Sequence, residues 1–133
     1  VAALALGAEG IQMRTRFVAT RESIAHQKCK EALVKAEAVD TVVFLRGMPI
    51  GPFRALKNRL TTKIVERENQ GASMQEIAAM RGYDKARQGM LDGDVDDGFI
   101  WYGLAAGQIR EIIGAGEVVR SIIDGAEAIL NGL

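Results

Sequence analysis

The residues of this sequence best suited to chemistry stand together as Gln12-Met13-Arg14-Thr15-Arg16. An arginine side chain is permanently charged and can bind a phosphate through two parallel N–H groups. Thr15 adds a hydroxyl donor. Where a strand ends and a helix begins, unpaired backbone N–H groups also bind anions. The pattern therefore predicts a phosphate-binding segment formed by Gln12, Met13, Arg14 and Thr15.

The elements expected to position this segment lie directly around it. Ala2 to Leu6 is an apolar run that predicts the end of a helix, and Ile11 to Met13 predicts a short strand. The polar turn Arg14-Thr15-Arg16 follows at once. A helix, a short buried strand and a loop at its carboxyl end are typical of βα-repeating enzymes, whose last loops collect phosphate groups. The predicted fold class is therefore α/β.

A helix is predicted next, starting at Thr20 or Ser23 and ending near Ala36. Its first turn contains His26, the one histidine of the chain. Two interpretations of His26 are an acid/base group and a locally hydrogen-bonded residue at the helix start. The second is favoured because no acidic partner stands nearby in sequence. Cys29, the one cysteine, is expected to pack as a small hydrophobic side chain.

Thr41 to Leu45 is β-branched and aromatic, and predicts a strand. After a Gly/Pro-rich break, Pro52 is expected to open an amphipathic helix from Phe53 to Asn69. Its basic residues are interpreted as a solvated helix face rather than as a site for phosphate or a carrier protein. Ser73 and Glu76 form a capping box for a short helix that ends at Met80.

Three further elements are predicted toward the end of the chain. After a helix from Tyr83 to Leu91, the acidic turn 93–98 lacks EF-hand spacing and is expected to cap the next helix. That helix is predicted from Phe99 to Ile113, and Gly103 and Gly107 allow either tight packing or the close approach of a flat ligand. An amphipathic helix from Glu117 to Leu133 closes the chain.

The composition excludes several functional classes. With 17 basic and 17 acidic side chains the formal net charge is zero, which argues against a nucleic-acid-binding surface. The sequence has no apolar run of the roughly 18 residues needed for a membrane span. A single cysteine rules out an internal disulfide and a cysteine-based zinc site, and no metal site is predicted. A cytoplasmic protein is expected.

Several segments carry a family resemblance in the same order along the chain: Gly7–Thr20, Asp40–Val43, Arg54–Asn58, Gly93–Val95 and Ala106–Gln108. In these the chain resembles the flavin-dependent nitronate monooxygenases, formerly called 2-nitropropane dioxygenases. The family also includes FMN-dependent enoyl-acyl-carrier-protein reductases. The resemblance implies the C-terminal part of a (β/α)8 TIM barrel, mostly helical here. A whole barrel takes roughly 250 residues, so a chain of 133 is expected to be a fragment.

The resemblance implies FMN as the cofactor, with Gln12, Met13, Arg14 and Thr15 at its phosphate and Gly107 and Gln108 beside its ring. It implies a nitronate or an acyl substrate in the full-length enzyme. It places the catalytic histidine upstream of this chain, so no catalytic residue is expected here and turnover by this chain alone is not expected. Residues 1–133 would form a single partial domain, the last βα unit plus a helical region.

Two points stay open at this stage. Relatives usually carry Gly where Arg14 stands. If that backbone is left-handed, Arg14 adds strain and blocks the phosphate; if it is ordinary, Arg14 strengthens the contact by its charge.

A second pair of alternatives concerns the function of the chain. A non-catalytic helical remnant would bury its apolar faces by self-association, and an oligomer is expected under both hypotheses because part of a barrel leaves helix faces uncovered.

Overall fold

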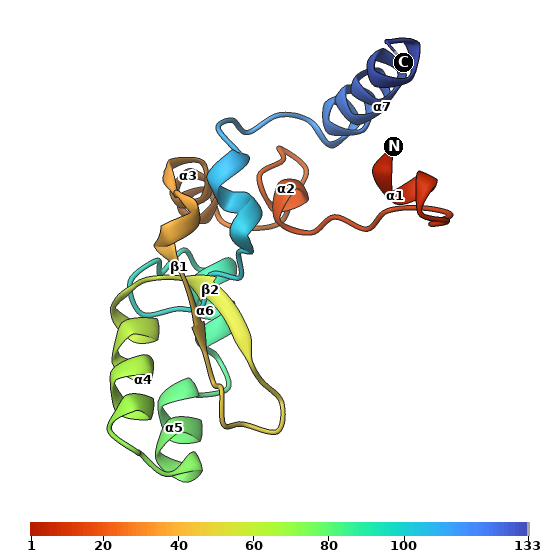
Figure 1. Cartoon of the computed structure of the whole chain (residues 1–133). Helices are drawn as coiled ribbons and strands as arrows, with labels where there is room; N and C mark the ends of the chain where they lie inside the picture. Colours follow the sequence, from red (N-terminus) through yellow and green to blue (C-terminus); the bar gives the residue numbers. More distant parts are fainter. Residues whose placement is uncertain (133) are drawn as a thin grey trace.

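The computed structural model describes residues 1–132 and shows a helical body built around one β-hairpin (Figure 1). The strands are β1 (Thr41–Phe44) and β2 (Phe53–Leu56), and the short 3-10 helices are η1 (Ala38–Asp40) and η2 (Leu104–Gln108). The α-helices are α1 (Ala2–Ala5), α2 (Thr15–Val18), α3 (Gln27–Lys35), α4 (Arg59–Asn69), α5 (Met74–Arg81), α6 (Lys85–Met90) and α7 (Ala115–Asn131).

The hairpin separates two apolar clusters. Its strands are antiparallel, with Thr41 opposite Leu56 and Phe44 opposite Phe53. Because alternate residues of a strand face opposite sides, Ala55 lies in one cluster while Leu56 packs against the other. The α4 cluster consists of Phe44, Leu45, Ala55, Leu60, Ile64, Ile77 and Phe99. The α3 cluster consists of Ala19, Cys29, Leu33, Ala36, Ile100, Tyr102, Ala106 and Ile109.

The residues from Phe99 to Tyr102 run between these clusters in an irregular, strand-like form. Phe99 and Trp101 pack on the α4 cluster, whereas Ile100 and Tyr102 belong to the α3 cluster. This alternation has the period of a strand, not of a helix. The helix predicted from Phe99 to Ile113 is therefore wrong, and only its middle is helical, as η2. Burial on both sides made these residues uniformly apolar, which hid the period in the sequence.

The helix predicted from Phe53 to Asn69 begins later than expected, at Arg59. Its first residues pair with β1 instead, because a hairpin satisfies their backbone groups. Asn58 is the N-cap: its Oδ1 accepts from the Thr61 N–H at 2.9 Å. Pro52, expected to open the helix, precedes β2.

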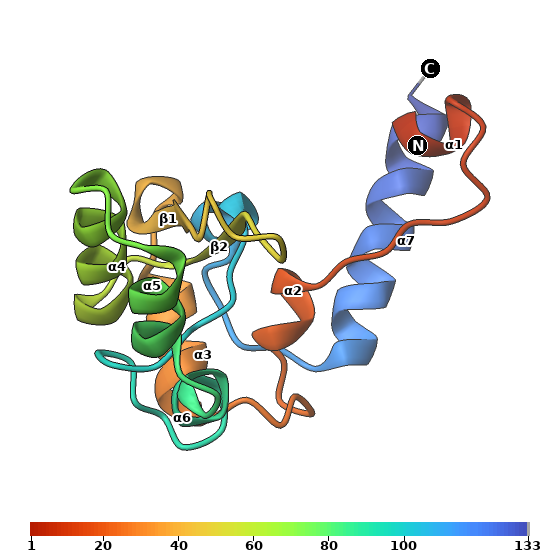
Figure 2. The ribbon, with the colours of Figure 1, turned by 90° about the horizontal axis from the view of Figure 1, so that it is seen from below.

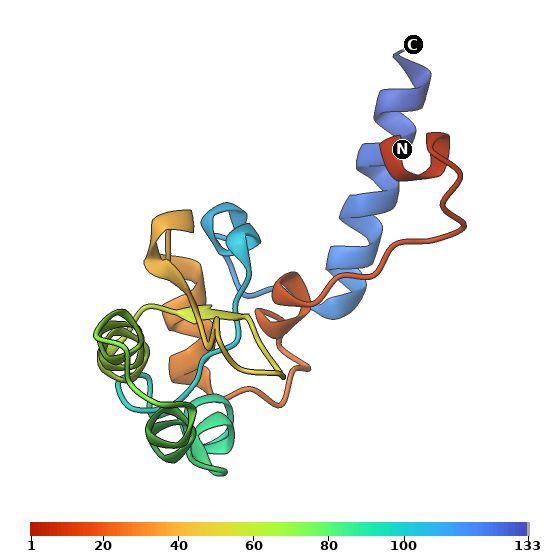
Figure 3. The same cartoon turned by 60° about the horizontal axis from the view of Figure 1, so that its bottom comes forward.

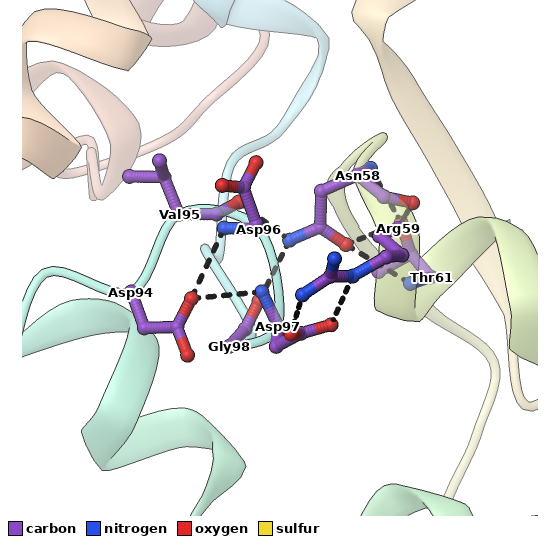
Figure 4. Close-up of polar contacts among 8 residues, drawn as sticks. All are labelled: Asn58, Arg59, Thr61, Asp94, Val95, Asp96, Asp97 and Gly98. Carbon is purple, nitrogen blue, oxygen red and sulfur yellow. Dashed lines mark hydrogen bonds and ion pairs between the residues drawn. The ribbon is translucent and has the colours of Figure 1, made fainter.

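Asn58 also joins α4 to the acidic turn (Figure 4). Its Nδ2 donates to the carbonyls of Val95 at 2.9 Å and Gly98 at 2.8 Å. Both of these hydrogen bonds are partly buried. They fix the loop that leads directly into the segment 99–102, so one side chain sets both the start of α4 and the position of that segment.

The sequence predicts that the acidic turn caps a following helix, and this prediction is wrong. Asp94 Oδ1 accepts from the N–H groups of Asp96 at 3.3 Å and Asp97 at 2.9 Å. Asp97 pairs with Arg59 of α4 in a bidentate contact (Figure 4). The Arg59 guanidinium lowers the pKa of the Asp97 carboxyl. The turn is therefore a structural link, and no group of metal-ligating side chains occurs within residues 1–132.

The remaining helices largely follow expectation. The strand at Thr41, the capping box of Ser73 with Glu76 and the closing helix are confirmed, although Leu133 lies outside the described residues. The helix expected from Thr20 or Ser23 instead begins at Gln27. Its N-cap is His26, because the polar groups of Thr20 and Ser23 bond within their own turns.

Helices α7 and α1 stand apart from the body and lie beside each other (Figures 2 and 3). Many apolar side chains of this arm are exposed, among them Leu4 of α1 and Ile123, Ile129 and Leu130 of α7. An apolar cavity of about 270 Å³ lies between α1 and α7. After α1, the chain runs from the arm into the body through α2. None of the helices in the described part of the chain is long and apolar enough to cross a membrane.

Candidate functional site

The predicted phosphate segment has no regular structure before Thr15. Gln12 and Met13 are exposed and irregular, and Arg14 is the N-cap of α2. The strand predicted from Ile11 to Met13 is wrong, because a strand needs a hydrogen-bonded neighbour and residues 1–132 place none beside it. Of the backbone N–H groups from Gln12 to Thr15, none donates to another group of the described chain.

Arg14 has an ordinary backbone conformation, with φ −113° and ψ −63°. These angles test the left-handed backbone that the first alternative requires. The residue carries no left-handed strain, so the alternative in which Arg14 strains the backbone is excluded, while a contact between its charge and a phosphate stays a prediction. Its side chain lines a cavity of about 210 Å³.

Thr15 fixes the position of this cavity. It is almost completely buried, and its Oγ1 accepts from the Gly103 N–H at 3.0 Å across 88 residues of sequence. This bond holds α2 against the start of η2. The Thr15 hydroxyl proton has no acceptor within residues 1–132 and can donate into the cavity.

Besides Arg14 and Thr15, the cavity is lined by Arg54, Trp101 and Tyr102, which the sequence did not mark as functional. Its lining is Arg14, Thr15, Arg54, Trp101, Tyr102 and Gly103, and none of these is acidic. Arg54 was placed on a helix by its sequence, whereas it lies on β2 and faces the side of Leu56, toward α2. Two apolar runs separated by a Gly/Pro-rich turn were the available signal for this hairpin.

Gly107 and Gln108, the expected ring contacts, lie at the far end of η2 and not in this cavity. A Cβ on Gly107 would stand 2.8 Å from the Ala38 nitrogen, so close packing against η1 requires glycine here. Arg110 donates from Nη2 to the Gly107 carbonyl at 2.5 Å. Gln108 is exposed. The structure thus shows the packing role of Gly107, and a contact with a flavin ring stays a prediction.

His26 and Cys29 have structural roles, as expected. His26 Nδ1 accepts from the Lys28 N–H at 3.2 Å and caps α3, and Gly93 packs directly against the imidazole. Cys29 is fully buried, and its thiol donates to the Gly89 carbonyl at 2.8 Å. Burial raises the pKa of this thiol to about 11, so the reactive thiolate is suppressed.

The architecture matches solved structures of FabK from Thermotoga maritima. One of these structures superposes on this chain with a TM-score of 0.83 at 35% sequence identity. The superposition covers 99% of this chain and 42% of the FabK chain. A single-residue mutant of the same protein gives a TM-score of 0.78 at 32% identity, covering 98% and 37%. The fold is therefore α/β and corresponds to the C-terminal part of a (β/α)8 barrel, mostly helical in this chain.

The family follows from sequence comparison. The nitronate monooxygenase family model matches residues 1–125. A probable nitronate monooxygenase from Staphylococcus saprophyticus is 38% identical over 72 residues, which are 53% of this chain and 19% of that protein. The chain belongs to the nitronate monooxygenase family, a family of flavin-dependent oxidoreductases. It spans about one fifth of the length of that curated relative.

Proposed function

We propose that this chain forms part of an FMN-dependent oxidoreductase, in which Gln12, Met13, Arg14 and Thr15 bind the phosphate of the flavin nucleotide. The observation that supports the proposal most is the set of open N–H groups in this segment. Four consecutive amides without an acceptor in residues 1–132 suit an anion, since unpaired backbone donors bind oxyanions readily. The family membership agrees with this assignment.

The residues present fit a phosphate group. Arg14 borders the cavity with an unstrained backbone, and the free proton of Thr15 supplies a neutral donor beside it. When bound, the flavin supplies the redox chemistry. The role of this chain is to hold the phosphate and thereby fix the orientation of the nucleotide. Gly107 and Gln108 complete the proposal as contacts to the ring.

The reaction we propose for the full-length enzyme is oxidation of an alkyl nitronate. The curated relative, a probable nitronate monooxygenase, favours this reaction. Reduction of an enoyl-acyl-carrier-protein is the alternative within the same flavoenzyme class. In both cases residues 1–133 act as the last βα unit with its helical region, within a cytoplasmic protein.

Titration with FMN and riboflavin tests the phosphate site, because the two ligands differ only in the phosphate. The native chain is expected to bind FMN more tightly than riboflavin, as measured by flavin fluorescence. Arg14→Gln and Arg14→Gly should both weaken FMN binding and leave riboflavin binding unchanged, since the native φ gives glycine no advantage. Arg120→Gln, an exposed change on α7, is the matched control.

Two outcomes would contradict this proposal. Equal affinity for the two flavins would remove the phosphate site. Tighter FMN binding by Arg14→Gly, with weaker binding by Arg14→Gln, would show that the family's glycine geometry is required at this position.

Self-association is a second proposed function, supported by the exposed apolar side chains of α1 and α7. The partner we propose is a second copy of this chain, which would cover these side chains. Sedimentation velocity across a range of concentrations should show a dimer or larger oligomer, and Ile123→Glu should shift it toward the monomer. A yellow sample favours the flavoenzyme, whereas a colourless oligomer favours a non-catalytic remnant.

A further inference from the structure

Arg14 and Arg54 line the cavity described above, to which α2 and β2 both contribute, without any carboxylate partner in the described residues. The ion pairs of residues 1–132 involve Arg21, Arg59, Arg67, Arg87 and Arg110, and neither Arg14 nor Arg54 takes part in one. Both side chains border the same cavity of about 210 Å³, which has no acidic lining residue. Two positively charged side chains on one cavity, with no acidic neighbour in its lining, favour an anion as the ligand.

Arg54 is held in place but is not saturated. Its Nη1 donates to Thr41 Oγ1 at 2.9 Å, which anchors the guanidinium to β1. This is the one hydrogen bond that Arg54 makes through its side chain within residues 1–132, and a guanidinium has five N–H donors. The remaining donors are available to a ligand, and the anchored geometry lowers the entropy lost when the ligand binds.

We propose that Arg54 is a second anion-binding residue, and that Arg14, Arg54 and the Thr15 hydroxyl together bind a phosphoryl group in this cavity. The proposal rests on the proposed function for the identity of its nucleotide ligand, because FMN would bring this group. It goes beyond that function by adding a residue from the hairpin. Inorganic phosphate carries the same chemistry and is a second possible source of the anion.

Trp101 provides a direct measurement of this site. It is the single tryptophan of the chain and lines the same cavity, so its fluorescence reports on the cavity without any flavin. Titration of the native chain with inorganic phosphate should change the Trp101 emission. Arg54→Gln should weaken this response at least about tenfold, the loss expected when a charged hydrogen-bonding partner is removed. Arg54→Lys should fall between the two, because lysine keeps the charge but not the planar fork.

Two control variants separate binding from folding. Thr41→Val removes the anchoring hydrogen bond and leaves the guanidinium, so phosphate binding should weaken by less than in Arg54→Gln. Arg46→Gln makes the same charge change on the exposed part of the hairpin, outside the cavity, and should leave the phosphate affinity unchanged. Circular dichroism of each variant establishes that the fold is retained.

The flavin titrations distinguish the two proposals. If Arg54→Gln weakens FMN binding but not riboflavin binding, the nucleotide is the source of the anion. If phosphate alone changes Trp101 emission in an Arg54-dependent way, and no flavin binds, the anion site stands and the proposed function fails. If FMN binds the native chain and Arg54→Gln equally, the role of Arg54 is overturned while the proposed function remains. The role of Arg54 is also overturned if the Trp101 emission responds to neither phosphate nor FMN.

Discussion

Replacement of Asn58 tests how the fold positions the cavity. In the native chain its Oδ1 caps α4, and its Nδ2 bonds two carbonyls, those of Val95 and Gly98 (Figure 4). Loss of an N-cap costs about 1 kcal/mol. Each partly buried carbonyl that loses its donor costs about 1 kcal/mol more. We therefore expect Asn58→Ala to lower the free energy of unfolding by about 3 kcal/mol, measured by urea denaturation with circular dichroism.

A serine variant divides this loss between its two causes. Asn58→Ser retains a cap for α4 but has no group that reaches Val95 and Gly98, so it should lose about 2 kcal/mol. Trp101 emission should change in both variants, because the lost bonds fix the loop leading into its segment. Asn69→Ala, at the exposed end of the same helix, should change stability by less than about 0.5 kcal/mol.

Two results would refute this reasoning. A loss below about 1 kcal/mol for Asn58→Ala would mean that neither role contributes as the contacts indicate. Full stability in Asn58→Ser would mean that the bonds between α4 and the acidic turn contribute nothing beyond the cap.

The remaining predictions concern packing and titration. Gly107→Ala should lower the stability of the chain in urea, because the new Cβ would stand 2.8 Å from the Ala38 nitrogen. Gly103→Ala should lower it less, because its Cβ would stand 3.4 Å from Thr15 Oγ1. Equal losses of stability in the two variants would contradict this reasoning. Cys29 should resist Ellman's reagent in the folded chain and react in urea. Because burial raises the pKa of Cys29 from about 9 to about 11, unfolding free energy should fall between pH 9 and 11, and Cys29→Ala should reduce this fall.

Local sequence patterns predicted several elements correctly because their causes are local. The capping box of Ser73 and Glu76 satisfies the helix start within four residues, and α7 shows its amphipathic period over four turns. The residue pattern at Gln12 to Thr15 indicated an anion site, which stays a prediction, and the backbone N–H groups there donate to no group of residues 1–132. The sequence also carried the family, through short segments in a fixed order.

Tertiary contacts decided which residues share the cavity with Arg14 and Thr15. Arg54 enters the cavity because β2 pairs with β1, and a strand presents alternate residues to opposite faces while a helix does not. Trp101 and Gly103 reach the cavity because their segment is held between two clusters and bonded to Thr15, 88 residues earlier in the chain. The sequence alone determined which hydrogen-bond donors the chain carries. Only long-range pairing, whose energy comes from residues distant in sequence, determined which of them meet in one cavity.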